Sequence, residues 1–271
     1  MNVLAIGASK NIGYYSVLRL LDAKCNVTFM LRSPSVFDSD EIIQSYVRSG
    51  QAHLIKGNAL VESDMKRAWD EALTHGVVDL VFSSIGASLK DSSFSLRKGI
   101  IISPANLVTQ AVLNILCTMP TQSPKPKIVT ISSGGLTHSG HAALPLLLKP
   151  LYATMGIPHK DKLGAERAIA YCAGWKWDTE TDGPGDDFMG EGWMEREGLP
   201  AAGTLKGVLV IRPAFLTDGD CRADSKKDAY KVQEEEIGGW TVSRKDVAHF
   251  VADAVLNRWN EFSDKIVNIG Y

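Results

Sequence analysis

The stretch GASKNIGYYSVLRLL, residues 7–21, follows an apolar run at residues 2–6 and leads into a helical pattern. A strand, a glycine turn and a helix in this order form the phosphate-binding unit of dinucleotide-binding folds. One glycine makes the turn, and a later one lets helix and strand pack closely, so that the helix N-terminus faces the pyrophosphate. Gly7 and Gly13 occupy these two places. We therefore expect this turn to hold a dinucleotide.

Apolar runs alternate with stretches of helical period along the rest of the chain. The pattern predicts strands at residues 2–6, 26–31, 52–56, 77–83, 127–132, 207–211 and 265–269, and helices at about 12–23, 38–48, 63–74, 104–118, 159–173 and 244–257. Nearly continuous apolar strands indicate a parallel sheet that is covered on both faces. The expected fold is therefore α/β, a doubly wound Rossmann-like parallel sheet of about seven strands, in a single domain over residues 1–271.

Two helix starts carry local signals. Pro104 favours a helix that begins there, because its missing N–H costs little in the first turn. Ser243 followed by Asp246 resembles a capping box before the last helix.

The composition narrows the classes of partner. The chain has 271 residues, of which 45% are hydrophobic and 22% charged, with a formal net charge of −2. This balance gives no electrostatic reason to expect nucleic acid or an anionic membrane, so a small-molecule substrate is the natural ligand. Four scattered cysteines and the absence of an N-terminal signal pattern favour a cytoplasmic protein. The sequence leaves the oligomeric state open.

A long acidic segment at about residues 174–206 interrupts the alternation of strands and helices. It carries three of the six tryptophans and exceeds the 2–6 residues that usually join a helix to a strand. Two interpretations stay open: a surface excursion held down by its tryptophans, or a lid over the active site.

The end of the second predicted strand indicates which dinucleotide is bound. Proteins that select NAD place an acidic residue there for the ribose hydroxyls, whereas this strand ends in MLRSPS, with Arg32 and Ser33. The planar guanidinium of Arg32, with Ser33 and the loop cation Lys10, suits the 2′-phosphate of NADP. Asn11 tolerates the left-handed backbone that such a loop often requires. The expected cofactor is NADP.

These motifs in their order resemble the short-chain dehydrogenase/reductase superfamily, specifically its atypical NAD(P)-binding branch of reductases and nitrogen-metabolite-repression regulators. The resemblance rests on GASKNIG (7–13), MLR (30–32), GNA (57–59), SSIGAS (83–88), ISSGG (131–135), KLGAE (162–166), IRPAFL (211–216) and SRKDVA (243–248). It extends the cofactor-binding set to Gly7, Ser9, Lys10, Asn11, Ile12, Gly13, Arg32, Ser33, Asn58, Ala59, Ile85, Gly86, Lys162 and Pro213.

The resemblance also implies a catalytic serine, tyrosine and lysine. Ser133 and Lys162 match two of them, whereas Pro158 stands where the tyrosine is expected, four residues before the lysine. Ser133 can polarise a carbonyl, or SSGG can be only a tight turn beside the cofactor. Lys162 can contact the ribose, or it can pair with Glu166 on an exposed helix. Arg212 is expected to be structural.

Substitute proton donors come from nearby residues. Tyr152 and His159 are candidates, and so are His138 and His141 in LTHSGH; histidine has the most suitable ordinary pKa. The two-histidine spacing lacks a third ligand that would make a metal site.

The expected function is an NADPH-dependent oxidoreductase that reduces a small carbonyl, quinone or enone compound. Two alternatives stay open: a regulatory protein that binds NADP without turnover, and an isomerase or cyclase that keeps NADP as a structural group.

Overall fold

The computed structural model describes residues 1–86, 92–95 and 99–271, so the last two residues of the SSIGAS motif lie outside the described residues. Its centre is an eight-stranded sheet in the order β10-β12-β8-β7-β4-β1-β2-β3. The bounds in that order are Lys231–Gln233, Lys265–Gly270, Val208–Pro213, Lys127–Ile131, Leu80–Ser83, Asn2–Ile6, Asn26–Leu31 and Ala52–Lys56. All neighbours pair in parallel except β10 and β12, which are antiparallel.

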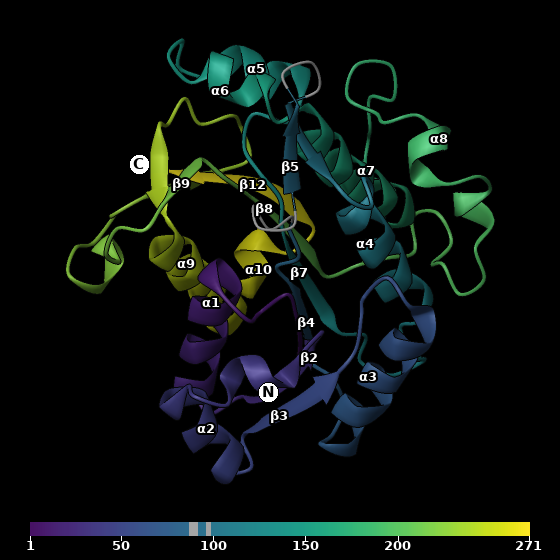
Figure 1. Cartoon of the computed structure of the whole chain (residues 1–271), viewed down its shortest axis with the longest axis vertical. Coiled ribbons are helices and arrows are strands. Elements are labelled where there is room, and N and C mark those ends of the chain that lie inside the picture. Colours follow the sequence, from purple (N-terminus) through teal and green to yellow (C-terminus); the bar gives the residue numbers. More distant parts are fainter. Residues whose placement is uncertain (87–91, 96–98) are drawn as a thin grey trace.

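Helices cover both faces of the sheet (Figure 1). On one face lie α1 (Asn11–Asp22), α2 (Glu41–Arg48) and α9 (Arg244–Leu256), and on the other α3 (Glu62–Thr74), α4 (Leu107–Cys117) and α7 (Gly156–Ala173). Along β1, Val3 and Ala5 pack in the first layer, whereas Leu4 and Ile6 pack in the second. This two-sided burial explains why the strands read as unbroken apolar runs. The predicted doubly wound fold is confirmed, with one short edge strand more than expected.

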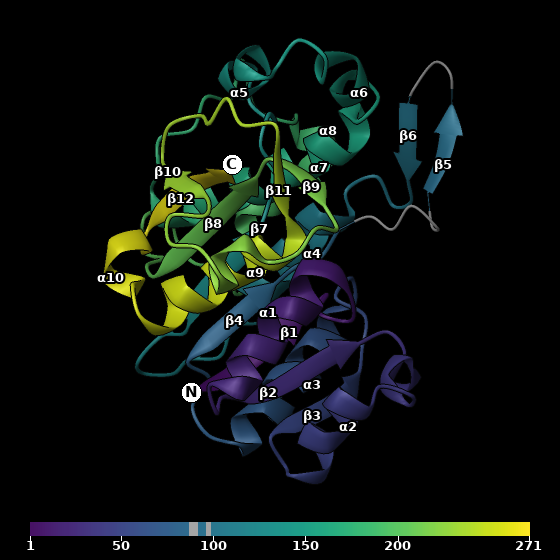
Figure 2. The same cartoon turned by 90° about the vertical axis from the view of Figure 1, so that its left-hand side faces the viewer.

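Short helices, 3₁₀ turns and two small sheets lie outside the main sheet. The helices are α5 (His138–Ala143), α6 (Lys149–Ala153), α8 (Asp186–Met189) and α10 (Trp259–Phe262), with 3₁₀ turns at Pro34–Phe37, Trp193–Glu195 and Arg222–Asp224. Two small sheets pair β9 (Phe215–Thr217) with β11 (Thr241–Ser243) and β5 (Ser92–Ser95) with β6 (Gly99–Ile102). The β5–β6 pair projects from the body of the molecule, beside the end that carries α5 and α6 (Figure 2).

Two helix starts show what local signals can decide. Ser243 caps α9 as predicted, because its hydroxyl accepts a hydrogen bond from the Asp246 N–H at 2.9 Å. Helix α4 begins at Leu107 rather than at Pro104, so that prediction is wrong. The buried carboxylate of Asp161 accepts from the N–H groups of Val108 and Thr109 at 2.8 Å each. A residue distant in sequence therefore satisfies the first turn of α4.

Candidate cofactor and active site

The turn between β1 and α1 has the geometry that its glycines predict. Gly7 has φ +75°, and a Cβ there would lie 2.7 Å from the Ile85 nitrogen. A Cβ on Gly13 would lie 2.7 Å from both the Ala8 Cα and the Gly7 oxygen. Asn11 adopts the left-handed conformation, with φ 55°. Both glycines are therefore required by close backbone approach, one between neighbouring strand ends and one between helix and turn.

The turn lies where the strand order of the sheet reverses. β1 pairs with β2 on one side and with β4 on the other, so the chain leaves β1 and β4 in opposite directions. Ligands of open α/β sheets bind at the carboxyl ends of strands at such a switch point. Ile85 and Gly86 follow β4 there; Gly86 is exposed, and a Cβ on it would meet no described atom within 4 Å. Crowding by the described residues therefore does not explain this glycine.

The residues expected around the adenosine half follow β2 and β3 on the same edge. Lys10, Arg32 and Ser33 are exposed, and the Ser33 and Ser35 hydroxyls lie 2.8 Å apart. The turn after β3 is fixed by hydrogen bonds that the Asn58 side chain and the Ala59 carbonyl make with Leu60 and Asn114. Of the remaining loop residues, Ser9 is half-buried and Ile12 is buried.

Lys162 reaches from α7 to the carboxyl end of β7. Its ammonium donates to the carbonyl of Ser132 at 2.7 Å and to that of Ile131 at 3.3 Å. Desolvation lowers the pKa of Lys162 to about 8, although the nearby Asp161 and Glu166 carboxylates oppose the shift. The ammonium thus contacts the residue that precedes Ser133. Ser133 itself is half-buried, and its hydroxyl donates to the Gly134 carbonyl at 3.3 Å.

Glu166 turns toward the sheet rather than toward Lys162. Its carboxylate accepts from the Ser132 hydroxyl and from Arg212, whose Nη2 lies 2.5 Å from Oε2. Burial alone would lower the pKa of Arg212, but Glu166 raises it above its ordinary value. The chain Ser132–Glu166–Arg212 joins the carboxyl ends of β7 and β8 to the middle of α7. Sequence reasoning did not find it: spacing offered a Lys162–Glu166 pair on an exposed helix as one of two interpretations and gave Glu166 no other partner. The glutamate is instead buried.

Pro158 lies in the first turn of α7, where a missing N–H breaks no helical hydrogen bond. Two of the candidate proton donors lie close together: the ring centroids of Tyr152 and His159 are 5.3 Å apart. Burial raises the pKa of Tyr152. Burial, with Lys162 and His141, lowers the pKa of His159 to about 4, so its imidazole is neutral at pH 7.

A backbone hydrogen bond and a small cavity lie next to these residues. Gly134 donates its N–H to the Pro213 carbonyl at 2.7 Å, which joins the turn after β7 to the end of β8. Tyr152 lines a cavity of about 10 Å³ with Gly134, Arg212 and Glu236, room for about one water. The structure therefore brings Ser133, Lys162, Tyr152, His159 and Pro213 to one edge of the sheet, the edge that carries Gly7.

The acidic segment divides into two parts. Near its start, the Asp182 carboxylate accepts from the backbone N–H of His138 at 2.6 Å, which places it against α5. Farther on, Met189 and Trp193 are buried and pack against α4 and α7, with the Trp193 ring under the Arg167 guanidinium. The second part is held down by apolar burial.

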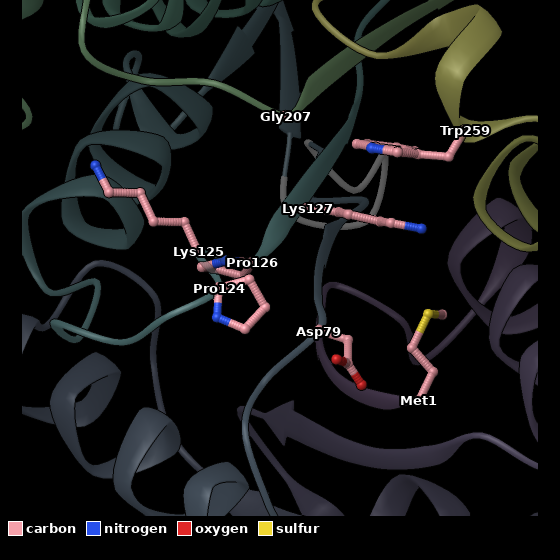
Figure 3. Close-up of a pocket in the computed structure, with 8 residues that line it drawn as sticks. All are labelled: Met1, Asp79, Pro124, Lys125, Pro126, Lys127, Gly207 and Trp259. Carbon is pink, nitrogen blue, oxygen red and sulfur yellow. The ribbon is translucent and has the colours of Figure 1, made fainter.

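A cavity of about 520 Å³ lies at the opposite end of the sheet (Figure 3). Its lining includes Asp79, Lys127 and Gly207 at the amino ends of β4, β7 and β8, with Trp259 facing the Lys127 ammonium at 4.9 Å. None of the candidate site residues lines it. Among residues 1–86, 92–95 and 99–271, no group of three acidic, His or Cys residues is arranged to hold a metal ion. Over the same ranges, no helix has the length and apolar character needed to cross a bilayer.

Comparison with known proteins identifies relatives in sequence and in fold. No family model matches the chain. It is 32% identical to Reductase pytE of Aspergillus terreus over 205 residues, which cover 72% of this chain and 68% of the relative.

Solved structures share the fold along nearly the whole chain. A short-chain dehydrogenase/reductase of Serratia marcescens superposes with a TM-score of 0.60 at 13% identity and covers 98% of this chain and 94% of its own. A short-chain dehydrogenase of Burkholderia cenocepacia, solved in complex with NADP, gives 0.56 at 17% identity and covers 99% and 96%. The likeness to these structures shows the fold, and the reductase shows kinship in sequence. The chain therefore belongs to the same family as this reductase, and it has the fold of the short-chain dehydrogenases/reductases.

Proposed function

We propose that this protein is an NADPH-dependent reductase of a small carbonyl, quinone or enone compound. The observation that carries the proposal is the Gly7 turn, which packs directly on Ile85 where the strand order reverses. This supports a dinucleotide that crosses the sheet edge from β2 to β7. The sequence relative is a reductase, and the Burkholderia fold relative was solved with NADP, which supports the same cofactor and chemistry.

The described residues fit this cofactor. A side chain on Gly7 or Gly13 would overlap the backbone, so these glycines allow the tight turn at the N-terminus of α1, where a pyrophosphate would bind. Arg32 and Ser33 would hold the 2′-phosphate with Lys10, and Asn58 and Ala59 would border the adenine. Ile85, Gly86, Lys162 and Pro213 would lie along the nicotinamide half.

When bound, NADPH supplies a hydride, which carries two electrons to the substrate carbon. Ser133 orients the substrate, because its hydroxyl can donate to the carbonyl oxygen. The same hydrogen bond stabilises the negative charge that develops on that oxygen. Lys162 would lie beside the nicotinamide ribose, and its two carbonyl partners leave one of its N–H donors for a ligand. The Ser132–Glu166–Arg212 chain fixes the backbone that carries Ser133.

The substrate class follows from the proton donors. With Pro158 in the tyrosine position, the protein belongs to the atypical type that lacks the usual acid. Quinones and enones suit such a site, because their reduced oxygen needs less help from a strong general acid than an ordinary alkoxide does.

The test is steady-state oxidation of NADPH with a panel of quinones, enones and aldehydes, together with fluorescence titration of NADPH binding. Turnover with at least one compound is expected. Tight binding without turnover on any compound would instead support the regulatory alternative, for which the proline at 158 is the specific observation. Conversion of a substrate without net NADPH oxidation would support an isomerase or cyclase.

A further inference from the structure

The Lys162 ammonium is built into the candidate site rather than extended into solvent. It is half-buried, and the carbonyls of Ile131 and Ser132 take two of its N–H donors. An ammonium has three such donors, so the hydrogen bonds to described residues leave one for a ligand. The position one helical turn earlier, from which a hydroxyl could reach the same place, is Pro158.

The other candidate donors in this cluster are poorly placed or in the wrong protonation state. Tyr152 is buried against Gly135, where a Cβ would lie 2.8 Å from its ring, and burial raises its pKa. No cation contributes to that shift, so nothing activates the phenol. His159 is neutral at pH 7, and its buried Nε2 has no hydrogen-bond partner among the described residues.

The charged and titratable groups near Lys162 lie on α7 itself and on α5. On α7 itself, Asp161 and Glu166 favour the ammonium. Asp161 is held by the N-terminus of α4, and Glu166 is paired with Arg212 of β8. Neutral His159 is close enough to Lys162 for the lysine charge to lower its pKa, and His141 of α5 lowers that pKa as well. Desolvation prevails over the two carboxylates, which leaves an ammonium that is charged at pH 7 and more acidic than an ordinary lysine.

We infer that Lys162 is itself the proton donor of the reduction, in place of a tyrosine; the inference rests on the proposed function. NADPH gives a hydride to the substrate carbon and becomes NADP⁺, while the carbonyl π pair moves to oxygen. The Nζ–H bond then breaks, an O–H bond forms, and Lys162 is left as a neutral amine. Water returns the proton when the product leaves. For a quinone, the same two transfers give a hydroxydienone, which becomes the hydroquinone when its ring C–H loses a proton to water and the second oxygen gains one.

Two variants test this role against a merely structural one. In the wild type, kcat should fall as the pH rises through about 8, because the ammonium loses its proton there. Lys162→Arg keeps the positive charge but cannot give up a proton, so this limb should vanish and kcat at neutral pH should fall roughly 100-fold or more. Lys162→Ala should regain turnover in the presence of small primary amines, in proportion to their concentration. Exposed Lys160, on the same helix, provides the matched control Lys160→Ala.

A second readout needs neither cofactor nor turnover. NMR of ¹⁵N-labelled lysine in the protein alone, with the resonance assigned through Lys162→Arg, should show Lys162 titrating near pH 8. A wild-type rate that is independent of pH, or Lys162→Arg with the wild-type profile, would overturn the proton-donor role and leave the reductase function standing. Titration of Lys162 above pH 10 would overturn the role as well. If the wild type oxidises NADPH with no compound at any pH, the proposed function fails, and this inference with it.

Discussion

Glu166 and Arg212 form a buried, two-pronged ion pair at the carboxyl edge of the sheet. The Arg212 Nε lies 3.1 and 3.2 Å from the two carboxylate oxygens, and Nη2 lies 2.5 Å from Oε2. Both residues are buried: Glu166 is 1% exposed and Arg212 8%. Because the same carboxylate accepts from Ser132, the pair couples the stability of the fold to the backbone of the candidate active site.

We predict that Glu166→Gln lowers the free energy of unfolding by up to about 3–5 kcal/mol, because buried Arg212 loses its two-pronged partner and keeps only Glu236, whose Oε1 lies 3.6 Å from Nη1. Replacing both partners, with Glu166→Gln and Arg212→Met, should recover part of the loss. Urea denaturation measures both. The exposed pair Lys245–Asp220 is the control, and Asp220→Asn should cost at most about 1 kcal/mol. Equal small losses at both sites would contradict the buried-pair account.

Arg32→Ala should weaken NADPH binding roughly 10- to 100-fold and NADH binding far less, because a charge-assisted contact with the 2′-phosphate is lost. Fluorescence titration with both nucleotides measures the ratio. Arg48→Ala, which removes an exposed arginine from α2, should leave both affinities unchanged. An equal loss for the two nucleotides on Arg32→Ala would remove the argument for NADP.

Gly86→Ala should leave the free energy of unfolding within about 0.5 kcal/mol of the wild type, since its Cβ would meet no described atom. The same change should weaken NADPH binding if the cofactor passes over this residue. Gly13→Ala should differ, with a loss of about 1–3 kcal/mol, because its Cβ would overlap the turn. Unchanged NADPH affinity in Gly86→Ala would remove Gly86 from the cofactor site.

His159 should make the protein less stable in acid. Its folded pKa of about 4 lies below its ordinary value of 6.5, so between these values the unfolded chain binds a proton that the folded chain does not. Stability from this group is complete above pH 6.5 and is lost as the pH falls toward 4, by at most about 1.4 kcal/mol per pH unit. His159→Phe should remove that share in urea titrations over pH 4–7. Parallel curves for variant and wild type would refute it.

The first strand, the turn and α1 could be predicted from the sequence because every signal in them is local. Gly7, Asn11 and Gly13 act within seven residues, and each has the conformation or packing that its residue type suggests. The alternation of apolar strands and helices predicted the layers for the same reason. The edge strand β10 escaped notice, since three residues paired on one side carry no apolar pattern.

The catalytic half could be predicted only as a set of candidates. Its contacts join residues far apart in sequence, as Asp161 joins the start of α4 and Glu166 joins Arg212. Spacing left two interpretations of Lys162 open, a ribose contact or a pair with Glu166 one helical turn away. Burial decided otherwise, because the interior satisfied the carboxylate with a guanidinium, and the ammonium turned to backbone carbonyls.

The most direct measurement is a crystal structure of the protein grown with NADP. The account predicts the pyrophosphate over the Gly7–Gly13 turn, the 2′-phosphate against Arg32, and the nicotinamide C4 facing the space beside Ser133 and Lys162. NADP bound elsewhere, or with its nicotinamide directed away from these two side chains, would contradict the account.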